Sequence, residues 1–303
     1  MNTAFFIVGP TASGKSQIAA DLAERCGGEV ISADALQIYR GLPLLTAQPN
    51  ETLLSQAPHH LLAAFPLTEE MSAAKFRELA LHALAEIYAR GKRVFVVGGS
   101  GLYLKALTHG LAPLPPVDQL LREELNGLSL DELQEQLTAL DPLGAATIDR
   151  RNKRRIVRAL EICAQTNAPA SAQRKEWKSE ATSARGVFVF RDRAELNTRI
   201  DRRVEEMFRG GVVEEVAAIK QLGATAAKTL GLREIQRLLA GEISEAECIS
   251  TIQQATRRYA KRQLTWFRRQ TNFEPLNLSL LKDHEAAVDW ILQKAERSFA
   301  PAE

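Results

Sequence analysis

The sequence has little cysteine, few aromatic residues and no long apolar segment. Cys26, Cys163 and Cys248 are too widely separated for a zinc motif, and their odd number does not suggest a disulfide framework. No apolar run approaches the ~20 residues needed to span a bilayer. The N-terminus lacks the basic lead of a secretory signal. These absences lead us to expect a cytoplasmic protein without a membrane partner.

The composition is otherwise that of an ordinary globular protein. The 303 residues are 45% hydrophobic and 25% charged, enough for one large domain or two modest ones. The net charge is only +2, but Arg150–Arg158 holds six cations in nine positions and Arg257–Arg269 holds six in thirteen. Such runs indicate either contact with an anionic polymer or a solvated helix face.

A phosphate-binding motif follows the first apolar run, Ala4–Val8. The residues are Gly9, Pro10, Thr11, Ala12, Ser13, Gly14, Lys15 and Ser16. A glycine, four free positions and Gly-Lys-Ser, set between a strand and a helix, form the phosphate-loop pattern. Backbone N–H groups, the positive helix end and Lys15 would bind a polyphosphate, and Ser16 could hold Mg²⁺. The motif therefore predicts polyphosphate binding with Mg²⁺ as cofactor.

The first hundred residues alternate strand and helix patterns. We expect strands at 4–8, 29–32 and 93–97, and helices at 16–25 and after Ser72, the last ending at Gly91. This alternation predicts an α/β fold, a P-loop NTPase-like parallel sheet with helices on both faces. Parallel sheets bind ligands at the carboxyl ends of their strands. The phosphate loop, Asp34 and Gly98–Gly101 should therefore surround one pocket.

The middle of the chain reads as a helical insertion. Residues from about 118 to 178 are charged and helical, with no convincing strand, whereas Gly186–Phe190 reads as a strand returning to the sheet. We therefore expect a catalytic core at 1–112 and 184–303 and an insertion at 113–183. The later helices are predicted at 194–208, 212–222, 244–269 and 285–296.

The residues beside the phosphate loop differ from those of a motor ATPase. The apolar run Val94–Val97 ends in Gly98-Gly99-Ser100-Gly101 rather than in an acid, and the acid follows another strand, as Asp34. Asp34 could hold a metal through water, take a proton from a nucleophile, or merely cap a turn. Ser100 could donate or accept a hydrogen bond, or lie in a plain strand-to-helix turn.

Several segments occur in one order that is typical of a single family. They are Gly9–Ser16, Ser32–Asp34 with Ile38–Gly41, His59–Leu61, Gly98–Leu107, Arg155–Ile162 and Thr256–Arg268. Over residues 4–270 the chain resembles the tRNA dimethylallyltransferases, also called tRNA isopentenyltransferases. The resemblance implies transfer of a dimethylallyl group from dimethylallyl diphosphate to N6 of the adenosine 3′ to the anticodon, in tRNAs that read codons starting with U. Pyrophosphate is released. No zinc-finger segment follows, so a bacterial-type member is expected.

The resemblance also implies roles for single residues. Asp34, Ser100 and Lys15 would be catalytic: Asp34 accepts the proton of the amine, Ser100 stands where threonine is usual and bonds the base, and Lys15 stabilises the leaving group. Arg199 and Arg203 would neutralise pyrophosphate with the phosphate loop. Ordinary surface arginines are the alternative reading of that pair.

The implied RNA partner is the anticodon stem-loop, whose target base must leave its stack. The implied contacts are Asp34, Ala35, Leu36, Gln37, Ser100, Arg122, Arg154, Arg155, Ile156, Val157, Arg158, Lys228, Gly231 and Arg233. Ala35, Gln48 and Leu232 depart from the family pattern, which puts RNA affinity or the placement of Asp34 in question. Tyr259, Trp266 and Phe267 could be core anchors or base-stacking platforms.

Three other functions fit part of the pattern. A P-loop small-molecule kinase would share Gly-Lys-Ser and a nearby acid, although the basic runs and Gly98–Leu107 fit it poorly. A non-catalytic RNA-binding protein would bind tRNA and leave it unmodified. An enzyme that prenylates free adenine nucleotides would not need the arginine-rich insertion. We expect a monomer.

Overall fold

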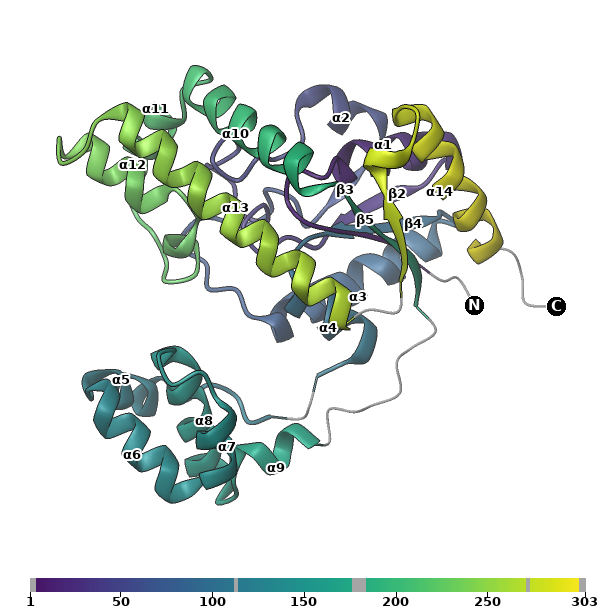
Figure 1. Ribbon diagram of the computed structural model, residues 1–303. Coiled ribbons are helices and arrows are strands. Elements are labelled where there is room, and N and C mark those ends of the chain that lie inside the picture. The colour runs from purple at the N-terminus through teal and green to yellow at the C-terminus, as the bar shows by residue number, and fades with distance from the viewer. Residues whose placement is uncertain (1–3, 112–113, 176–183, 271–272, 300–303) are drawn as a thin grey trace. The chain divides into compact units, whose positions relative to one another are not determined.

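The computed structural model describes residues 4–111, 114–175, 184–270 and 273–299. The chain divides into two compact units (Figure 1): residues 1–108 with 183–303 form the first, and residues 109–182 form the second. The first unit contains the sheet and the phosphate loop. The second contains helices α5 to α9 and falls in the segment expected to be an insertion.

The first unit is built on a six-stranded, all-parallel sheet in the order β3-β2-β4-β1-β5-β6. The strands are β1 Phe5–Val8, β2 Glu29–Ser32, β3 His59–His60, β4 Val94–Gly98, β5 Arg185–Phe190 and β6 Glu274–Asn277. The predicted α/β fold is confirmed, including the return of β5, which pairs with β1. The edge strands β3 and β6 are not predicted, because one has two residues and the other contains Pro275.

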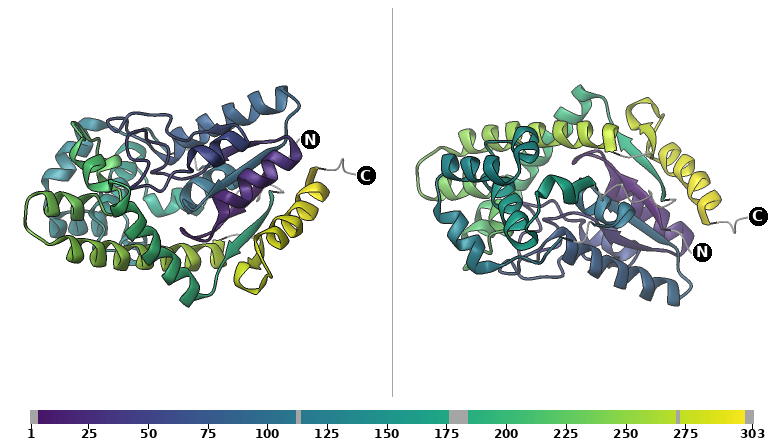
Figure 2. Two further views of the ribbon diagram at one scale, coloured as in Figure 1. Left: turned by 90° about the horizontal axis from the view of Figure 1, so that it is seen from above. Right: turned by 90° about the horizontal axis from the view of Figure 1, so that it is seen from below.

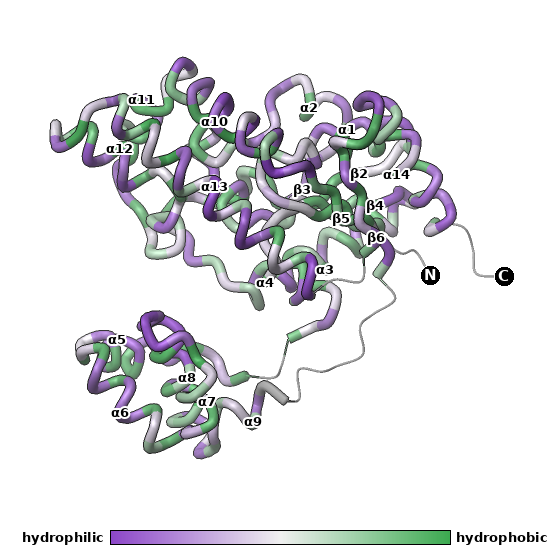
Figure 3. Tube along the Cα trace, viewed as in Figure 1, coloured by the Kyte–Doolittle hydropathy of each residue, from purple (hydrophilic) through white to green (hydrophobic). Residues whose placement is uncertain are grey.

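Helices cover both faces of this sheet (Figure 2). Side chains along a strand point alternately to the two faces, and here both sets are apolar and buried. Phe5 and Ile7 pack with α1 and α14, whereas Phe6 and Val8 pack with α3 on the opposite face. Apolar residues concentrate along the strands (Figure 3). The helices of this unit are α1 Lys15–Cys26, α2 Glu51–Gln56, α3 Ala73–Ala89, α4 Gly101–His109, α10 Arg193–Arg209, α11 Val212–Ala217, α12 Leu232–Leu239, α13 Glu245–Gln270 and α14 His284–Phe299, with 3₁₀ turns at Ala226–Lys228 and Leu278–Leu280.

Local sequence accounts for where several of these helices begin and end. Ser72 caps α3 as predicted, since its side chain accepts a hydrogen bond from the Lys75 N–H at 3.2 Å. Gly27 ends α1 in the left-handed conformation. The helix predicted at 212–222 is shorter in the structure, because α11 ends at Ala217.

The second unit is a helical bundle of its own. Its helices are α5 Gln119–Gly127, α6 Leu130–Leu140, α7 Pro142–Thr147, α8 Lys153–Thr166 and α9 Ala170–Lys175. Leu133, Leu137, Ile156 and Leu160 form the centre of its core. The prediction of a helical segment without strands is confirmed for the described residues. In neither unit is any described helix long and apolar enough to cross a membrane.

Candidate active site

The phosphate loop connects β1 to α1 in a conformation that only its small residues permit. Gly14 begins α1 with a φ of 99°, and Ala12 also has a positive φ of 63°. A Cβ atom on Gly9 would lie 2.2 Å from the carbonyl oxygen of Val189, so β5 passes too close for any larger residue. The Ser13 hydroxyl closes the turn by donating to the Pro10 carbonyl at 2.9 Å.

Four cations gather around this loop. Arg191, two residues before α10, donates from Nε to the Ser13 carbonyl at 2.9 Å, and Arg199, within α10, donates from Nε to the Ala12 carbonyl at 2.9 Å. Lys15 Nζ donates to the Pro10 carbonyl at 3.2 Å. Burial lowers the pKa of Lys15 to about 8 and that of Arg203 to about 10, and in both cases the nearby Asp34 carboxylate opposes the shift.

The four cations have two acids beside them among the described residues: Arg191 pairs with Glu195, and Asp34 lies near Lys15 and Arg203. The Nε atom of Arg203 is buried and has no hydrogen-bond partner among the described residues. Burying positive charge is costly unless it is paired, so these groups indicate a site for an anionic ligand. The structure thus brings Arg199 and Arg203 to the phosphate loop, where Arg199 is exposed and Arg203 is half-buried.

Two pockets meet at Asp34. The first is lined by Lys15, Ser16, Asp34, His59 and Gly98 among others. It confirms the expectation that the loop, Asp34 and the glycine turn share a pocket. The second has Thr11, Asp34, Arg203 and Tyr259 beside apolar walls. The apolar wall residues are Leu36, Leu45, Ala47, Val204, Met207, Leu230 and Ile252.

Asp34 is held by the turn that follows it. Its Oδ1 accepts hydrogen bonds from the N–H groups of Leu36 at 3.0 Å and Gln37 at 3.4 Å. Asp34 therefore does cap a turn, and its Oδ2 has no hydrogen-bond partner in the part of the chain that the structure describes. One oxygen fixed by the backbone and one open oxygen suit a group that accepts a proton.

Ser100 joins the Asp34 turn to the glycine turn after β4. Its Oγ accepts a hydrogen bond from the Ala35 N–H at 2.9 Å, and the Tyr259 phenol is a second partner of this hydroxyl. The two turns are in close contact, since a Cβ on Gly98 would lie 2.2 Å from the Ala33 carbonyl oxygen. The hydrogen bond to Ser100 uses the backbone N–H of Ala35, so it does not depend on the side chain at position 35.

Gln48 and Leu232, which differ from the family pattern, both have contacts that stabilise the fold. Gln48 Nε2 donates to the carbonyls of Gln37 and Tyr39, at 3.1 and 2.7 Å, and Gln37 Nε2 in turn donates to Thr46 and Ala47. The amide thereby holds the loop after Asp34. Leu232 is buried in the apolar core that α11 and α12 share with Leu42 and Leu45. Of the other expected contacts here, Lys228 and Arg233 are exposed and Gly231 begins α12 with a φ of 92°.

The expected contacts of the second unit differ in their surroundings. Arg154 and Arg155 are exposed in the first turn of α8, whereas the side chains of Ile156 and Val157 are buried in the core. Arg122 and Arg158 both bind the fully buried Glu161. Arg122 Nη2 lies 2.8 Å and Arg158 Nη1 3.0 Å from Glu161 Oε2. Part of the basic run is therefore engaged in holding this unit together.

The second basic run lies on α13. Arg257, Arg258, Lys261 and Arg268 line a groove, and Arg257 also forms an ion pair with Asp201. Of the three aromatics in the run, Phe267 is a core anchor, since its ring stacks on Phe188 at 5.3 Å. Trp266 packs against Gly101, and Tyr259 lines the second pocket.

Gln263 has no role in the sequence-based prediction of the site. His59 is named there only as part of a family segment, and Tyr259 is left as a core anchor or a base-stacking platform. Burial lowers the pKa of His59, and its Nδ1 lies 2.8 Å from the Ala57 carbonyl oxygen. Burial also raises the pKa of Tyr259, so the phenol stays neutral. The helical spacing of 256, 259, 263 and 267 indicates that one face of α13 is covered, but not which element covers it.

The site could hold Mg²⁺ with few protein ligands. Among the described residues no group of three or more histidine, cysteine, aspartate or glutamate side chains could bind a metal ion. The Ser16 hydroxyl and the Asp34 carboxylate line the same pocket. This sparse set of oxygen atoms fits Mg²⁺, which keeps several waters and binds largely to phosphate.

The parallel sheet and its phosphate loop define an α/β protein of the P-loop type, with a site whose charge suits an anionic ligand. The sequence model of the family described as IPP transferase matches residues 37–270. The chain belongs to this IPP transferase family.

Similar proteins agree with this assignment. The tRNA dimethylallyltransferase of Akkermansia muciniphila is 40% identical over 289 residues, covering 95% of this chain and 98% of that protein. The solved tRNA isopentenylpyrophosphate transferase of Bacillus halodurans is 33% identical, with a TM-score of 0.70 and 98% of each chain covered. A eukaryotic dimethylallyltransferase acting on tRNA has a TM-score of 0.83 at 24% identity, with 100% of this chain and 81% of that chain covered, and supports the fold alone.

Proposed function

We propose that this protein transfers a dimethylallyl group from dimethylallyl diphosphate to the N6 amine of the adenosine 3′ to the anticodon, in tRNAs that read codons starting with U. The names of its relatives support tRNA prenyl transfer. The observation that carries the proposal is the place of Asp34, which lines both pockets, beside Lys15 of the phosphate loop in one and beside Arg203 and an apolar wall in the other.

The phosphate loop would bind the leaving diphosphate. As the allylic C–O bond breaks, negative charge grows on the departing oxygens, and preorganised donors at that position lower the barrier. Lys15, Arg199 and Arg203 supply positive charge, and burial makes Lys15 and Arg203 costly to leave unpaired. An anion in the loop would therefore raise the pKa of both groups again.

Asp34 would accept the proton that the amine loses. The adenine N6 forms a bond to the allylic carbon while the C–O bond breaks, and one N–H proton passes to the carboxylate. The open Oδ2 supports this role, because Oδ1 is held by the N–H groups of Leu36 and Gln37. The Ser100 hydroxyl, held by the Ala35 N–H, could donate to the base and orient it.

Mg²⁺ would be held by the Ser16 hydroxyl, with the Asp34 carboxylate in the same pocket. When bound, it would neutralise charge on the diphosphate oxygens. The loop would bind and orient the diphosphate through Lys15 and its backbone N–H groups, which do not require the metal.

The exposed arginines at the start of α8, Arg154 and Arg155, support phosphate contacts to the anticodon arm. The target base would be flipped out of its stack to reach Asp34. A small-molecule kinase is not favoured, because relatives over nearly the whole chain are named as tRNA dimethylallyltransferases. A cytoplasmic monomer remains our expectation.

The test is direct. The pure protein is incubated with Mg²⁺, labelled dimethylallyl diphosphate and unmodified tRNA, and the tRNA is digested and analysed by mass spectrometry. Label on the adenosine 3′ to the anticodon, with stoichiometric pyrophosphate, is the expected result. Unlabelled tRNA together with ATP-dependent phosphorylation of a small acceptor would instead establish a kinase.

A further inference from the structure

Gln263 of α13 joins two loops of the site through a single side chain. Its Oε1 accepts a hydrogen bond from the Thr11 N–H of the phosphate loop at 2.9 Å. Its Nε2 donates to the carbonyl of Gly99, just before Ser100, also at 2.9 Å. The side chain is buried, with 6% of its surface exposed. One amide therefore bridges the anion-binding loop and the turn that carries Ser100.

An amide suits this bridge. One loop presents a donor and the other an acceptor, and the glutamine amide offers an acceptor and a donor on two separate atoms without carrying charge. The fit is close, since a Cβ on Gly99 would lie 2.4 Å from Gln263 Nε2 and 3.1 Å from the Gly9 carbonyl oxygen. Both polar atoms are satisfied, as a buried amide requires.

Neighbouring side chains of α13 hold the same turn. The ring of Trp266 covers Gly101, where an added Cβ would lie 2.5 Å from the ring. The Tyr259 phenol interacts with the side chains of Ser100 and Gln263. Phe267 anchors this part of α13 to the sheet through Phe188. The helix is therefore held firmly beside both loops.

We propose that Gln263 is a positioning residue, which sets the spacing between the phosphate loop and the pair Ser100–Asp34. The connection runs from the Thr11 N–H through Gln263 to Gly99, and from Ser100 to the Ala35 N–H beside Asp34. It holds the diphosphate and the proton acceptor at their working separation. The inference rests on the proposed prenyl transfer, where a misplacement of ~1 Å costs about 10²-fold in rate.

Gln263→Glu is the decisive variant. Its ionised carboxylate still accepts from Thr11 but faces the Gly99 carbonyl without a hydrogen, whereas the protonated acid can make both bonds. Burial beside a carbonyl raises the pKa of such an acid. We expect kcat to fall about 10–100-fold at pH 8, with the deficit relative to wild type shrinking as the pH is lowered.

Gln263→Leu and Gln253→Leu are the companion variants. Gln263→Leu removes both bonds, so its deficit in kcat should be independent of pH, and its KM for tRNA should stay within about twofold of wild type. Gln253 lies on the same helix and donates to the Asp201 carbonyl at 3.2 Å, so Gln253→Leu should behave as wild type. Thermal unfolding of each variant confirms that it is folded.

Three outcomes separate the inference from the proposed function. Wild-type kcat in both Gln263 variants would overturn the inference, and so would a Gln263→Glu deficit that does not change with pH. A wild-type protein that prenylates no tRNA would refute the proposed function instead. Calorimetry with pyrophosphate then still tests the bridge: Gln263→Leu should bind about 10-fold more weakly, and unchanged affinity would overturn it.

Discussion

Replacing Asp34 with asparagine tests its role as proton acceptor while keeping the turn that it caps. Asparagine keeps an oxygen that can accept from the Leu36 N–H, now at 3.0 Å from Asp34 Oδ1, so the turn is retained. It cannot accept the proton of the amine. Loss of a general base lowers kcat by about 10²–10⁴-fold. At ~1.36 kcal/mol for each tenfold change, this corresponds to about 2.7–5.4 kcal/mol in the activation barrier.

The substitution also removes a negative charge from between the cations. Asp34 raises the pKa of Lys15 and of Arg203, against the effect of burial. Without it, the pKa of Lys15 falls below its present value of about 8, and fewer molecules carry the charged amine at alkaline pH. We therefore expect KM for dimethylallyl diphosphate to rise most above pH 7, while kcat falls at every pH.

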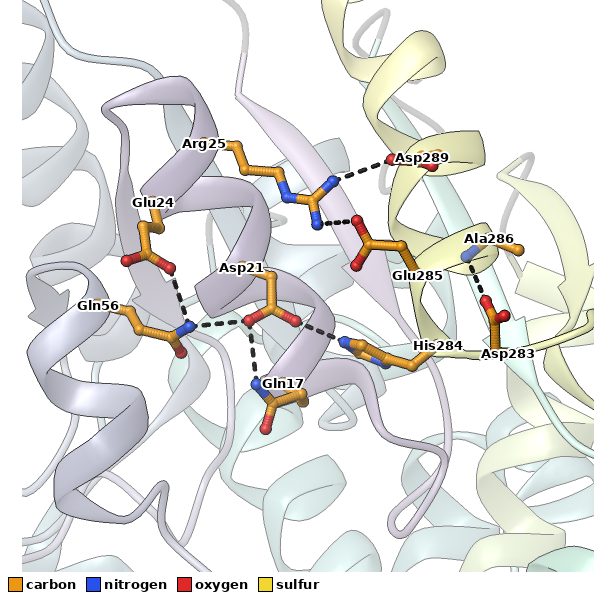
Figure 4. A network of polar contacts seen from close by, with 10 residues as sticks. All are labelled: Gln17, Asp21, Glu24, Arg25, Gln56, Asp283, His284, Glu285, Ala286 and Asp289. Carbon is orange, nitrogen blue, oxygen red and sulfur yellow. Dashed lines mark hydrogen bonds and ion pairs between the residues drawn. The ribbon is translucent and has the colours of Figure 1, made fainter.

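Single-turnover transfer of label to tRNA, measured from pH 6 to 9, separates the two effects. Asp21→Asn is the matched control, because Asp21 lies on α1 in a separate network with Gln17, Gln56 and His284 (Figure 4). It should leave kcat unchanged. If Asp34→Asn turned over as fast as this control, Asp34 would not be the proton acceptor.

Three further predictions follow from the same structure. Wild-type KM for dimethylallyl diphosphate should rise as the pH passes through about 8, because unbound Lys15 loses its proton there. Binding in that pH range should take up a proton, which calorimetry in two buffers detects. A KM independent of pH would contradict this role of Lys15. Arg154→Ala with Arg155→Ala should weaken tRNA binding and reduce the slope of log affinity against log salt by about 1–2, since each phosphate contact contributes ~0.9; an unaltered slope would make these arginines a solvated face. Glu161→Ala should destabilise the second unit by up to about 3 kcal/mol, because Arg122 and Arg158 lose their buried partner; an unchanged denaturation midpoint would show that the cluster adds no stability.

Local patterns in the sequence account for a large part of the fold and of the site. The phosphate loop is contiguous, so its glycines, Lys15 and Ser16 could be assigned without any long-range contact. The Ser72 cap and the strand runs are equally local. The alternation of strands and helices predicted that Asp34 would lie near the phosphate loop, because the carboxyl ends of parallel strands meet at one edge of the sheet.

Pairings between distant residues could be found only in the folded chain. Gln263 and Thr11 are 252 positions apart, and nothing in the periodicity of α13 indicates that this side chain reaches the phosphate loop. The burial of Ile156 and Val157 follows from the amphipathic pattern of α8, but the ion pair between Glu161 and Arg122 of α5 joins residues 39 positions apart.

The sequence by itself thus determined the anion-binding loop, the class of fold and the acid beside the loop, because each depends on neighbours in the chain or on the order of its elements. The tertiary structure alone decided which cations are buried and which form ion pairs. It also decided that α13 bridges the phosphate loop and the turn after β4. Those properties depend on desolvation and on hydrogen-bond geometry, which arise only when distant segments pack together.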